Sequence, residues 1–399
     1  MKLSPSVFRS LIFLFFSLSV VTMQAQEPKR VIPDSIRISL LTCASGEEIY
    51  SLFGHTAIRY ENYTRGIDAV FNYGIFNFNA PNFILRFALG ETDYQLGVTD
   101  YERFAAEYYY LERDVWQQEL NLTVQEKEKL IMLLEENYRP ENRIYRYNFF
   151  YDNCATRPRD LIEKSIDGTL QYADDMTDTD SGISFRDLLH KYSKGHPWSR
   201  FGMDLCMGSQ ADRTINRRLM MFVPFYVQEY FNQARIVNKE GEARPLVLNE
   251  EKIIVTGNEE AEQPSDGFTP MQTALLLLIL TAAATIYGIR RKKTLWGIDF
   301  ALFFAAGTAG CILAFLALFS QHPAVSPNYL LFVFHPLHLF CLPCMLNRVR
   351  KRKRSRYMLA NFIVLTLFIL LWLVIPQRFP LAVLPFCLLY TSPSPRDST

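Results

Sequence analysis

The strongest constraint on the fold is a series of long apolar runs that begins at residue 271. Each run has about the length that the hydrocarbon core of a bilayer requires, and lipid forces such segments to satisfy their backbone hydrogen bonds within helices. We therefore predict an α-helical membrane domain over residues 269–386, with a truncated fifth span that begins near Leu381. The four complete spans are predicted at residues 271–289, 295–320, 329–346 and 358–376.

Two basic clusters indicate how these spans cross the membrane. Four consecutive basic residues, 290–293, follow the first span, and seven basic residues lie between Arg348 and Arg356. The positive-inside rule places both clusters in the cytoplasm. The loop at residues 321–328 contains no lysine or arginine, so it is expected on the outer side of the membrane.

The N-terminus has the layout of a secretory signal peptide. Lys2 and Arg9 precede an apolar run at residues 11–21, and Ala25 is a small residue suited to cleavage. We expect residues 1–25 to be removed and residues 26–256 to form a periplasmic domain tethered to the inner (cytoplasmic) membrane. An uncleaved signal anchor is the alternative, although the apolar core is short for a membrane span.

The charge of the chain is divided unevenly between its two parts. Residues 26–289 contain 27 lysines and arginines against 39 aspartates and glutamates, a net charge of −12, although the whole chain has a net charge of +1. So acidic a region is a poor partner for nucleic acid, and bulk charge would not hold it against an anionic leaflet. The acidic segment 257–268 also contains Gly, Pro and Ser, which indicates a linker to the membrane domain.

The last residues interrupt the pattern of the membrane domain. The sequence CLLYTSPSPRDST at residues 387–399 has no periodicity and cuts short the fifth apolar run. Translation of a common transposase sequencing adapter in one frame gives the peptide CLLYTSPSPRD. We therefore expect residues 387–399 to be a sequencing artefact and the natural protein to continue its apolar span. A genuine short polar tail is the alternative.

The segment YNFFYDNCATRPRD at residues 147–160 places one cysteine in a setting that favours reactivity. Residues 145–150 predict a β-strand, and residues 155–166 predict a helix with Pro158 in its first turn. Cys154 would then lie at a strand-to-helix junction, beside unpaired backbone N–H groups and the positive end of the helix dipole. This setting lowers a thiol pKa from about 8.5 toward neutrality and supplies donors for an oxyanion. We predict that Cys154 is a nucleophile.

The residues around Cys154 are candidates for binding a substrate or its oxyanion. Arg157 and Arg159 add positive charge at the start of the helix, and the backbone N–H groups near residues 154 and 155 are the expected oxyanion donors. The predicted binding set comprises Asn153, Ala155, Arg157 and Arg159, together with Arg59 from an earlier strand.

The cysteine count also bears on the state of Cys154. Of the seven cysteines, only Cys43, Cys154 and Cys206 lie outside apolar stretches, and three is an odd number. A disulfide between Cys43 and Cys206 would leave Cys154 free, although a sequence does not establish the pairing. A buried or disulfide-bonded Cys154 is the structural alternative to a nucleophile.

Histidines are scarce before the apolar region, which narrows the search for a base. Only His55, His190 and His196 occur there, and the last two lie at a polar helix end and in a loop, where a solvated or capping histidine is usual. His55 lies instead on a predicted hairpin with strands at residues 53–60 and 68–75. A lone strand histidine is more often a packed polar residue, but the presence of a candidate nucleophile favours His55 as the base.

The same hairpin predicts a third residue that would orient the imidazole. If the turn centres near Thr64, residue 55 lies opposite residues 72 and 73. Asn72 is then the favoured partner, with Tyr73 and Asp68 as alternatives. Gly54, which precedes the histidine, would allow another backbone to approach closely.

The remaining pattern of residues 26–256 predicts an α+β domain. Helices are expected at residues 82–89, 100–111 and 123–138, and a strand at residues 115–122. Thr123 and Glu126 form the signature of a capping box at the start of the third helix. The histidine strand precedes the cysteine helix, an order that resembles the circularly permuted branch of the papain-like, NlpC-type enzymes. That branch includes the lecithin:retinol acyltransferase-like enzymes.

A closer resemblance is carried by four segments: FGHTAIRY at 53–60, FNYGIF at 71–76, YNFFYDNCATRPRD at 147–160 and WSRFGMDLCMGSQADR at 198–213. They look like the signature segments of the Lnb-type lipoprotein N-acyltransferase family. The resemblance covers roughly residues 35–235 and the layout of the apolar spans. It implies a permuted papain-like periplasmic domain with Cys154 as nucleophile and His55 as base, whereas the third residue is our inference from strand pairing.

These observations lead to one expected function and two alternatives. The Cys154 thiolate would take an acyl chain from a phospholipid as a thioester, without a cofactor. The resemblance alone implies the acceptor, the N-terminal amine of a diacylglyceryl apolipoprotein. The alternatives are a membrane-tethered cysteine peptidase or amidase that cuts peptidoglycan peptides, and a non-enzymatic envelope scaffold.

Polar residues within the spans are also functional candidates. Asp299 lies close to a basic cluster and is expected to reach the cytoplasmic interface. His335 and His338 share a helix face and could line a lipid-facing groove or bind other polar groups. With Cys341 and Cys344 they imitate a metal site, but nearby prolines distort the helix, so no metal is expected.

Overall fold

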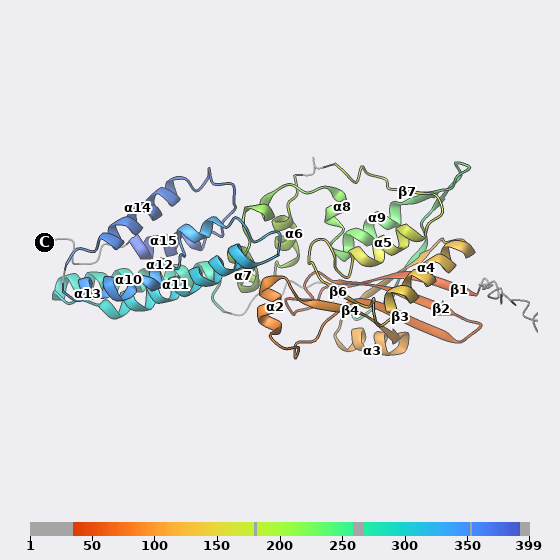
Figure 1. The fold of residues 1–399 in the computed structure, drawn as a ribbon, viewed down its shortest axis with the longest axis horizontal. Helices are drawn as coiled ribbons and strands as arrows, with labels where there is room; N and C mark the ends of the chain where they lie inside the picture. The colour runs from red at the N-terminus through yellow and green to blue at the C-terminus, as the bar shows by residue number, and fades with distance from the viewer. Residues whose placement is uncertain (1–34, 179–181, 258–266, 352, 392–399) are drawn as a thin grey trace, which may run out of the picture.

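The computed structural model describes residues 35–178, 182–257, 267–351 and 353–391. An antiparallel sheet domain with helices on both faces is followed by a region of apolar helices, as the sequence predicts for the fold class (Figure 1). The expected signal peptide, most of the expected linker and residues 392–399 of the suspect tail lie outside the described residues.

The central sheet has seven antiparallel strands in the order β10-β5-β1-β2-β3-β4-β6. The hairpin that carries His55 is confirmed as β2 and β3, near the middle of this sheet. The strands are β1 (Ile36–Cys43), β2 (His55–Asn62), β3 (Ile67–Ile75), β4 (Asp93–Asp100), β5 (Val115–Leu120), β6 (Ile144–Arg146) and β10 (Val247–Ile254).

Helices cover both faces of the sheet, which explains why β1 is buried along almost its whole length. On one face lie α4 (Val124–Tyr138), α5 (Thr156–Ser165) and α9 (Pro224–Gln233), packed on a large aromatic and aliphatic core. The other face is covered by α3 (Tyr101–Tyr110), over a smaller core. The strands therefore form a rigid layer between the two cores.

The start of α4 confirms the predicted capping box. The Glu126 N–H donates to the Thr123 hydroxyl at 3.3 Å, and the Thr123 N–H donates to the Glu126 carboxylate at 2.8 Å. The same buried carboxylate accepts a hydrogen bond from Arg244 and another, at 2.9 Å, from the Asp167 N–H. Glu126 therefore also joins α4 to the segment after α5 and to a short second sheet.

One prediction about strands is corrected, and one strand was missed. The strand expected at 145–150 stops at Arg146, because residues 147–153 form a turn closed by a bridge between Asn148 and Asp152. Strand β4 was not predicted. The remaining elements of this domain are α2 (Phe83–Leu89), β7 (Thr169–Gln171), α6 (Phe185–Tyr192), α7 (Pro197–Cys206), η1 (Ser209–Asp212), α8 (Arg217–Met220), β8 (Arg235–Val237) and β9 (Ala243–Pro245).

In the helical region, α10 (Pro270–Arg291) and α11 (Trp296–Phe319) are long and apolar enough to cross a membrane. The expected third span is broken between Tyr329–Phe340 and Leu342–Arg350, which are bent by 72°. Proline removes a hydrogen-bond donor, and Pro336 and Pro343 lie on either side of this break. The elements after α11 are η2 (Tyr329–Phe332), α12 (Leu337–Phe340), α13 (Leu342–Arg350), α14 (Arg356–Leu370), shorter than the expected fourth span, and α15 (Val383–Thr391).

The sheet domain contacts one end of the long apolar helices. The Trp198 indole donates to the Phe268 carbonyl at 2.8 Å just before α10, and the Gln321 N–H donates to the Leu89 carbonyl at 2.8 Å just after α11. Each helix is more than 30 Å long at about 1.5 Å per residue, so the basic turn between them lies far from the sheet domain. The loop at 321–328, predicted on the outer side, also binds η1 through Gly208.

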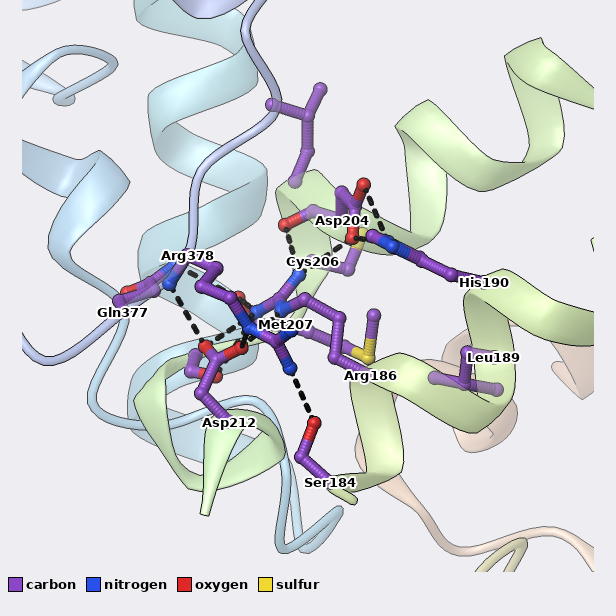
Figure 2. A network of polar contacts seen from close by, with 12 residues as sticks. Ser184, Arg186, Leu189, His190, Asp204, Cys206, Met207, Asp212, Gln377 and Arg378 are labelled. Atoms are coloured by element: carbon purple, nitrogen blue, oxygen red, sulfur yellow. Dashed lines mark hydrogen bonds and ion pairs between the residues drawn. The ribbon is translucent and has the colours of Figure 1, made fainter. Parts of the chain in front are cut away.

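A polar network reinforces this contact between the two parts (Figure 2). Arg186 is fully buried and donates to Asp204 and Asp212, each at 2.7 Å. Arg378, from the segment between α14 and α15, also binds Asp212 at 3.0 Å and Asp187 at 2.6 Å. Three carboxylates and two guanidinium groups thus connect α6, α7 and η1 with one another and, through Arg378, with the helical region.

The direction of the spans can be tested with reporter fusions. A reporter fused after Arg356 is expected to behave as cytoplasmic. One placed within 321–328 is expected to behave as periplasmic, because this loop has no lysine or arginine and contacts the sheet domain. Enzymatic reporters that are active on only one side of the membrane provide the measurement. The reverse pattern would contradict the topology.

The network around Arg378 predicts a pH-dependent stability. Burial alone would raise the pKa of Asp187, but hydrogen bonds from Arg378 and Ser184 lower it to about 2. Because the pKa of Asp187 is lower in the folded protein than in the unfolded chain, its ionised carboxylate stabilises the fold at a pH above the unfolded value of about 4. This stabilisation is lost as the pH falls toward 2. Arg378→Gln should lower the melting temperature at pH 7 by about 2–4 °C, because the pair is partly screened by solvent.

The control for this experiment is Arg139→Gln, because Arg139 forms an exposed ion pair with Glu136 at the C-terminal end of α4. Its effect on the melting temperature should be within about 1 °C. Equal effects of the two substitutions, or an Arg378→Gln effect that persists unchanged at pH 2, would show that the network does not stabilise the contact.

Candidate functional site

Cys154 lies two residues before α5, directly after the turn formed by residues 147–153. The buried side chain of Asn153 holds this turn in place. Its carbonyl oxygen accepts hydrogen bonds from the N–H groups of Ala155 and Thr156, both at 2.9 Å. Its amide nitrogen donates to the carbonyls of Phe149 and Phe222, both at 2.8 Å. All of these bonds fix the backbone on either side of Cys154.

This capping role corrects two predictions about oxyanion binding. The N–H of Ala155 was expected to face an oxyanion, but Asn153 already accepts its hydrogen. The side chain of Asn153 was expected to bind substrate, but both of its ends are bonded to the protein backbone. Both residues therefore position Cys154, and the donors near its sulphur come from elsewhere. Pro158 lies in the first turn of α5, as predicted.

The sulphur of Cys154 lies where β3 separates from β2. Pairing between these strands ends at Ala57 and Asn72, so Thr56 has no partner in β3. The N–H groups of Thr56 and of Cys154 itself donate toward the sulphur. Gly74 adopts φ 90°, and a Cβ there would lie 3.4 Å from the Cys154 Cβ. A glycine inside a strand marks such a close approach, and Gly74 is the sequence signal for it.

Burial controls the protonation state of Cys154. It raises the pKa of the thiol to about 11, although the N–H groups of Thr56 and Cys154 and the charge of Arg113 lower it. The sequence-based expectation of a pKa near neutrality is therefore wrong for this state of the site. The thiol is protonated at neutral pH, and a base must accept its proton for it to react.

His55 is the first residue of β2 and precedes Thr56, whose N–H faces the sulphur. Its Nε2 lies 3.2 Å from the Asn72 Oδ1. Because an amide oxygen only accepts, Nε2 carries the proton and Nδ1 keeps its lone pair. Burial and the nearby Arg113 lower the pKa of His55 to about 4, so the imidazole is neutral at physiological pH. A neutral imidazole can act as a proton acceptor.

Asn72 contacts His55 as predicted, but the register of the two strands differs from the predicted one. The observed register pairs Ala57 with Asn72, so residue 55 would extend opposite residue 74, one position beyond the predicted partners. Asn72 and His55 lie on the same face of the sheet and meet diagonally. The alternative Asp68 binds Arg59 at 2.6 Å, and the alternative Tyr73 packs in the core on the opposite face.

The three predicted arginine ligands have partners within the protein. Arg59 binds Asp68 and lies 3.3 Å from the centre of the Tyr101 ring, four residues along β2 from His55. At about 3.3 Å per residue this is about 13 Å from the candidate site. Arg157 forms a bidentate ion pair with Asp152, and Arg159 binds Asp160 at 2.8 Å. In this structure they stabilise local conformations.

Arg113 is the cation that sequence reasoning missed. It donates to the Ala44 carbonyl at 2.6 and 2.8 Å, and its charge lowers the pKa of both Cys154 and His55. The residue stands between α3 and β5, far in sequence from the cysteine and histidine motifs. No spacing rule connects it to them, so only the fold could identify it.

The predicted disulfide between Cys43 and Cys206 is not formed, because every described cysteine is a free thiol. Cys43 pairs with His55 across β1 and β2, and burial raises the pKa of its thiol to about 12. Cys206 ends α7, where its carbonyl accepts from Asn328 of the helical region at 3.5 Å. The two residues belong to separate contacts of the fold.

Other histidines have structural partners. His190 binds Asp204 at 2.8 Å in the polar network, rather than being fully solvated as its position suggested. The rings of His335 and His338 stack at 3.9 Å. The Tyr357 hydroxyl donates to one nitrogen of His338, and the other nitrogen donates to the Val333 carbonyl. Both nitrogens of His338 are thus occupied by protein groups.

Comparison with known protein families decides where the chain belongs. Residues 24–190 match the family model described as the Lnb N-terminal periplasmic domain, and residues 262–392 match the one described as the Lnb transmembrane domain. The chain is a member of the Lnb family. No curated protein and no solved structure matches it significantly.

Membership of the Lnb family assigns the two parts of the chain to their compartments. The sheet domain is periplasmic, and the helical region is a transmembrane domain. His55, Asn72 and Cys154 all lie within the periplasmic match. The segment between the matches contributes Phe222, which anchors Asn153, and β10, which completes the sheet.

The role of Asn153 can be tested by its removal. Asn153→Ala should lower the free energy of unfolding by about 2–4 kcal/mol, because it leaves two N–H groups and two carbonyls around a buried side chain without partners. Chemical denaturation or thermal unfolding of the purified protein provides the measurement. Asn153→Asp should also be destabilising, since a carboxylate keeps the acceptors but loses both donors.

Asn238→Ala is the matched control, because Asn238 also accepts from two backbone N–H groups, those of Glu240 and Glu242, through hydrogen bonds that are exposed to solvent. Its cost should be below about 1 kcal/mol, since water can replace the lost bonds. A similar cost for both substitutions would mean that the buried amide has no special role.

Proposed function

We propose that this protein is a lipoprotein N-acyltransferase that moves an acyl chain from a phospholipid, through a thioester on Cys154, to the N-terminal amine of a diacylglyceryl lipoprotein. The observation that carries the proposal is a protonated thiol and a neutral imidazole at the same strand end, in a periplasmic domain attached to a membrane domain. The resemblance of the four sequence segments to the Lnb-type enzymes supports the acceptor.

In the first half-reaction, the sulphur of Cys154 attacks the carbonyl carbon of a phospholipid ester while Nδ1 of His55 takes the thiol proton. The N–H groups of Thr56 and Cys154 are the proposed donors to the oxyanion. The ester C–O bond then breaks, and the imidazolium returns the proton to the leaving alkoxide. The products are a lysophospholipid and an S-acyl enzyme.

In the second half-reaction, the α-amine of the acceptor attacks the thioester carbonyl. His55 accepts a proton from the amine and delivers it to the departing sulphur, so that the free thiol is restored. Asn72 keeps the imidazole in the tautomer that leaves Nδ1 free. Arg113 favours the thiolate during both steps, since its charge lowers the pKa of Cys154.

The covalent intermediate is the direct test. Protein purified with phospholipid and without acceptor should gain an adduct of fatty-acyl mass that hydroxylamine removes, and peptide mapping should place it on Cys154. Cys154→Ala should abolish both the adduct and N-acylation, and His55→Ala should slow acylation by about 10²–10⁴-fold. Mass spectrometry of the protein and of a lipoprotein N-terminus provides the measurements.

Cys206→Ala is the control, because Cys206 is also partly buried and its thiol lies outside the site. It should keep full adduct formation. An adduct that maps to Cys43 or Cys206, or activity that survives the loss of Cys154, would refute the mechanism. Release of soluble peptides from peptidoglycan without any acyl adduct would indicate a peptidase or amidase instead.

The lowered pKa of His55 predicts the pH profile. The imidazole must be neutral to accept a proton, so kcat/KM should fall on the acid side only as the pH approaches about 4, rather than near 6.5. Arg113→Gln should move this acid limb upward, because it removes a charge that disfavours the imidazolium. An acid limb near 6.5 in the wild type, or one unaffected by Arg113→Gln, would contradict the assignment.

A further inference from the structure

Helix α2 exposes an unusual amount of apolar surface. It consists of the residues FILRFAL, none of which is buried. Ile84 is 83% exposed, and Leu85 and Phe87 are each 50% exposed. Adjacent large apolar side chains are rarely left in water on a soluble domain, so their exposure marks a contact surface.

The position of α2 indicates what this surface contacts. The carbonyls of Phe87 and Leu89 accept hydrogen bonds from His322 and Gln321, both at 2.8 Å, and these residues directly follow the span α11. Figure 1 shows α2 beside the end of the helical region that faces the sheet domain. Because the periplasmic end of a span marks the bilayer surface, the apolar face of α2 lies at the outer leaflet.

A continuous series of aromatic rings runs from α2 to Cys154. Phe87 stacks on Phe83 at 6.3 Å, Phe83 on Phe76 at 5.9 Å, and Phe76 contacts Tyr94 at 5.1 Å. Tyr94 stacks on Tyr147 at 4.0 Å. We call the five residues Phe87, Phe83, Phe76, Tyr94 and Tyr147 the aromatic track.

The inner end of the aromatic track adjoins the candidate nucleophile. A Cβ on Gly74 would lie 3.4 Å from the Cys154 Cβ and 4.0 Å from a ring carbon of Tyr147. The pKa values of Tyr94 and Tyr147 are raised, first by burial and also by the neighbouring Cys154. Both rings therefore lie in the immediate surroundings of the sulphur.

Exposure decreases along the aromatic track. At the outer end Phe87 is 50% exposed. Beside the track, Phe78 and Tyr50 pack on Phe76 at 4.6 and 5.7 Å and are 60% and 62% exposed. Toward the inner end Tyr94 is only 8% exposed, and Tyr147 beside Cys154 is partly buried. An apolar surface that begins at the leaflet and becomes buried near a thiol suits a long hydrocarbon chain with its ester at the inner end.

We propose that α2 and the aromatic track form the access route along which a phospholipid acyl chain passes from the outer leaflet to Cys154. This inference rests on the proposed function, since it assigns the donor lipid to that site. The exposed Tyr109 and Tyr110 do not form an equivalent surface, because α3 covers the opposite face of the sheet. The apolar face of α2 inserts into the leaflet, and the aromatic rings contact the chain as it leaves the bilayer.

The route can be tested without catalysis. Full-length Cys154→Ala protein is reconstituted into vesicles that contain phosphatidylethanolamine with a photoactivatable diazirine on one acyl chain. After illumination, cross-linked peptides should include α2 and residues 76–78, in addition to the spans. Cross-links confined to residues 270–391 would overturn the proposal, whatever the activity of the wild type.

A second experiment separates delivery of the lipid from chemistry. Ile84→Asp should reduce acylation of Cys154 by vesicle phospholipid at least tenfold, because a carboxylate on α2 opposes insertion. The same variant should react at the wild-type rate with a water-soluble short-chain p-nitrophenyl ester, which does not come from the bilayer. Met132→Asp is the matched control, since Met132 is an apolar residue on the solvent side of α4, 53% exposed, and it should leave both reactions unchanged.

The outcomes distinguish the two hypotheses. Equal rates for Ile84→Asp and wild type with vesicle phospholipid would overturn the route while leaving the proposed function intact. Loss of reaction with both donors at an unchanged melting temperature would also overturn it, because the substitution would then act on the chemistry. If the wild type forms no acyl adduct with either donor, the proposed function fails, and the cross-links alone decide whether lipid occupies the aromatic track.

Discussion

The side-chain amide of Asn153 is the interaction on which the candidate site depends. Its oxygen holds the first N–H groups of α5, and its nitrogen holds carbonyls of Phe149 and Phe222. One buried residue thus connects the turn, the cysteine helix and the segment before α9, and Cys154 lies between its bonded neighbours. A loss of this amide would affect four backbone groups in buried or partly buried positions, so the position of the thiol and the stability of the core are coupled.

Local signals predicted much of the fold. The capping box of Thr123 and Glu126, the glycine before His55 and the hairpin at 53–75 are all settled by neighbours in sequence. A Cβ on Gly54 would lie 2.7 Å from the Cys43 carbonyl, which is the close approach that the sequence suggested. The strand expected at 145–150 failed because Phe149 and Phe150 reach the core from a turn, where they pack against Phe222. Aromatic content alone does not distinguish the two conformations.

The chemistry of the site was less predictable than its residues. Cys154, His55 and Asn72 could be chosen from motif and pairing, yet the one-residue difference in register placed Gly74 beside the thiol. The helix dipole favours a thiolate, but burial of the sulphur outweighs it and leaves a neutral thiol. The charge of Arg113 and the N–H of Thr56 come from other strands and loops. Their effect depends on distances that only the tertiary structure supplies.

The contacts between the periplasmic and transmembrane domains also fix how far the sheet domain lies from the bilayer. Hydrogen bonds from residues on both sides of the span ends, together with the buried Arg186, hold the sheet domain against the outer end of the helices. A thiol held in this way samples only the thin layer of periplasm next to the bilayer. A partner with its own lipid anchor is confined to the same layer, so the two would meet by diffusion in two dimensions. Soluble molecules, spread through the whole compartment, would reach the site far less often at the same total number.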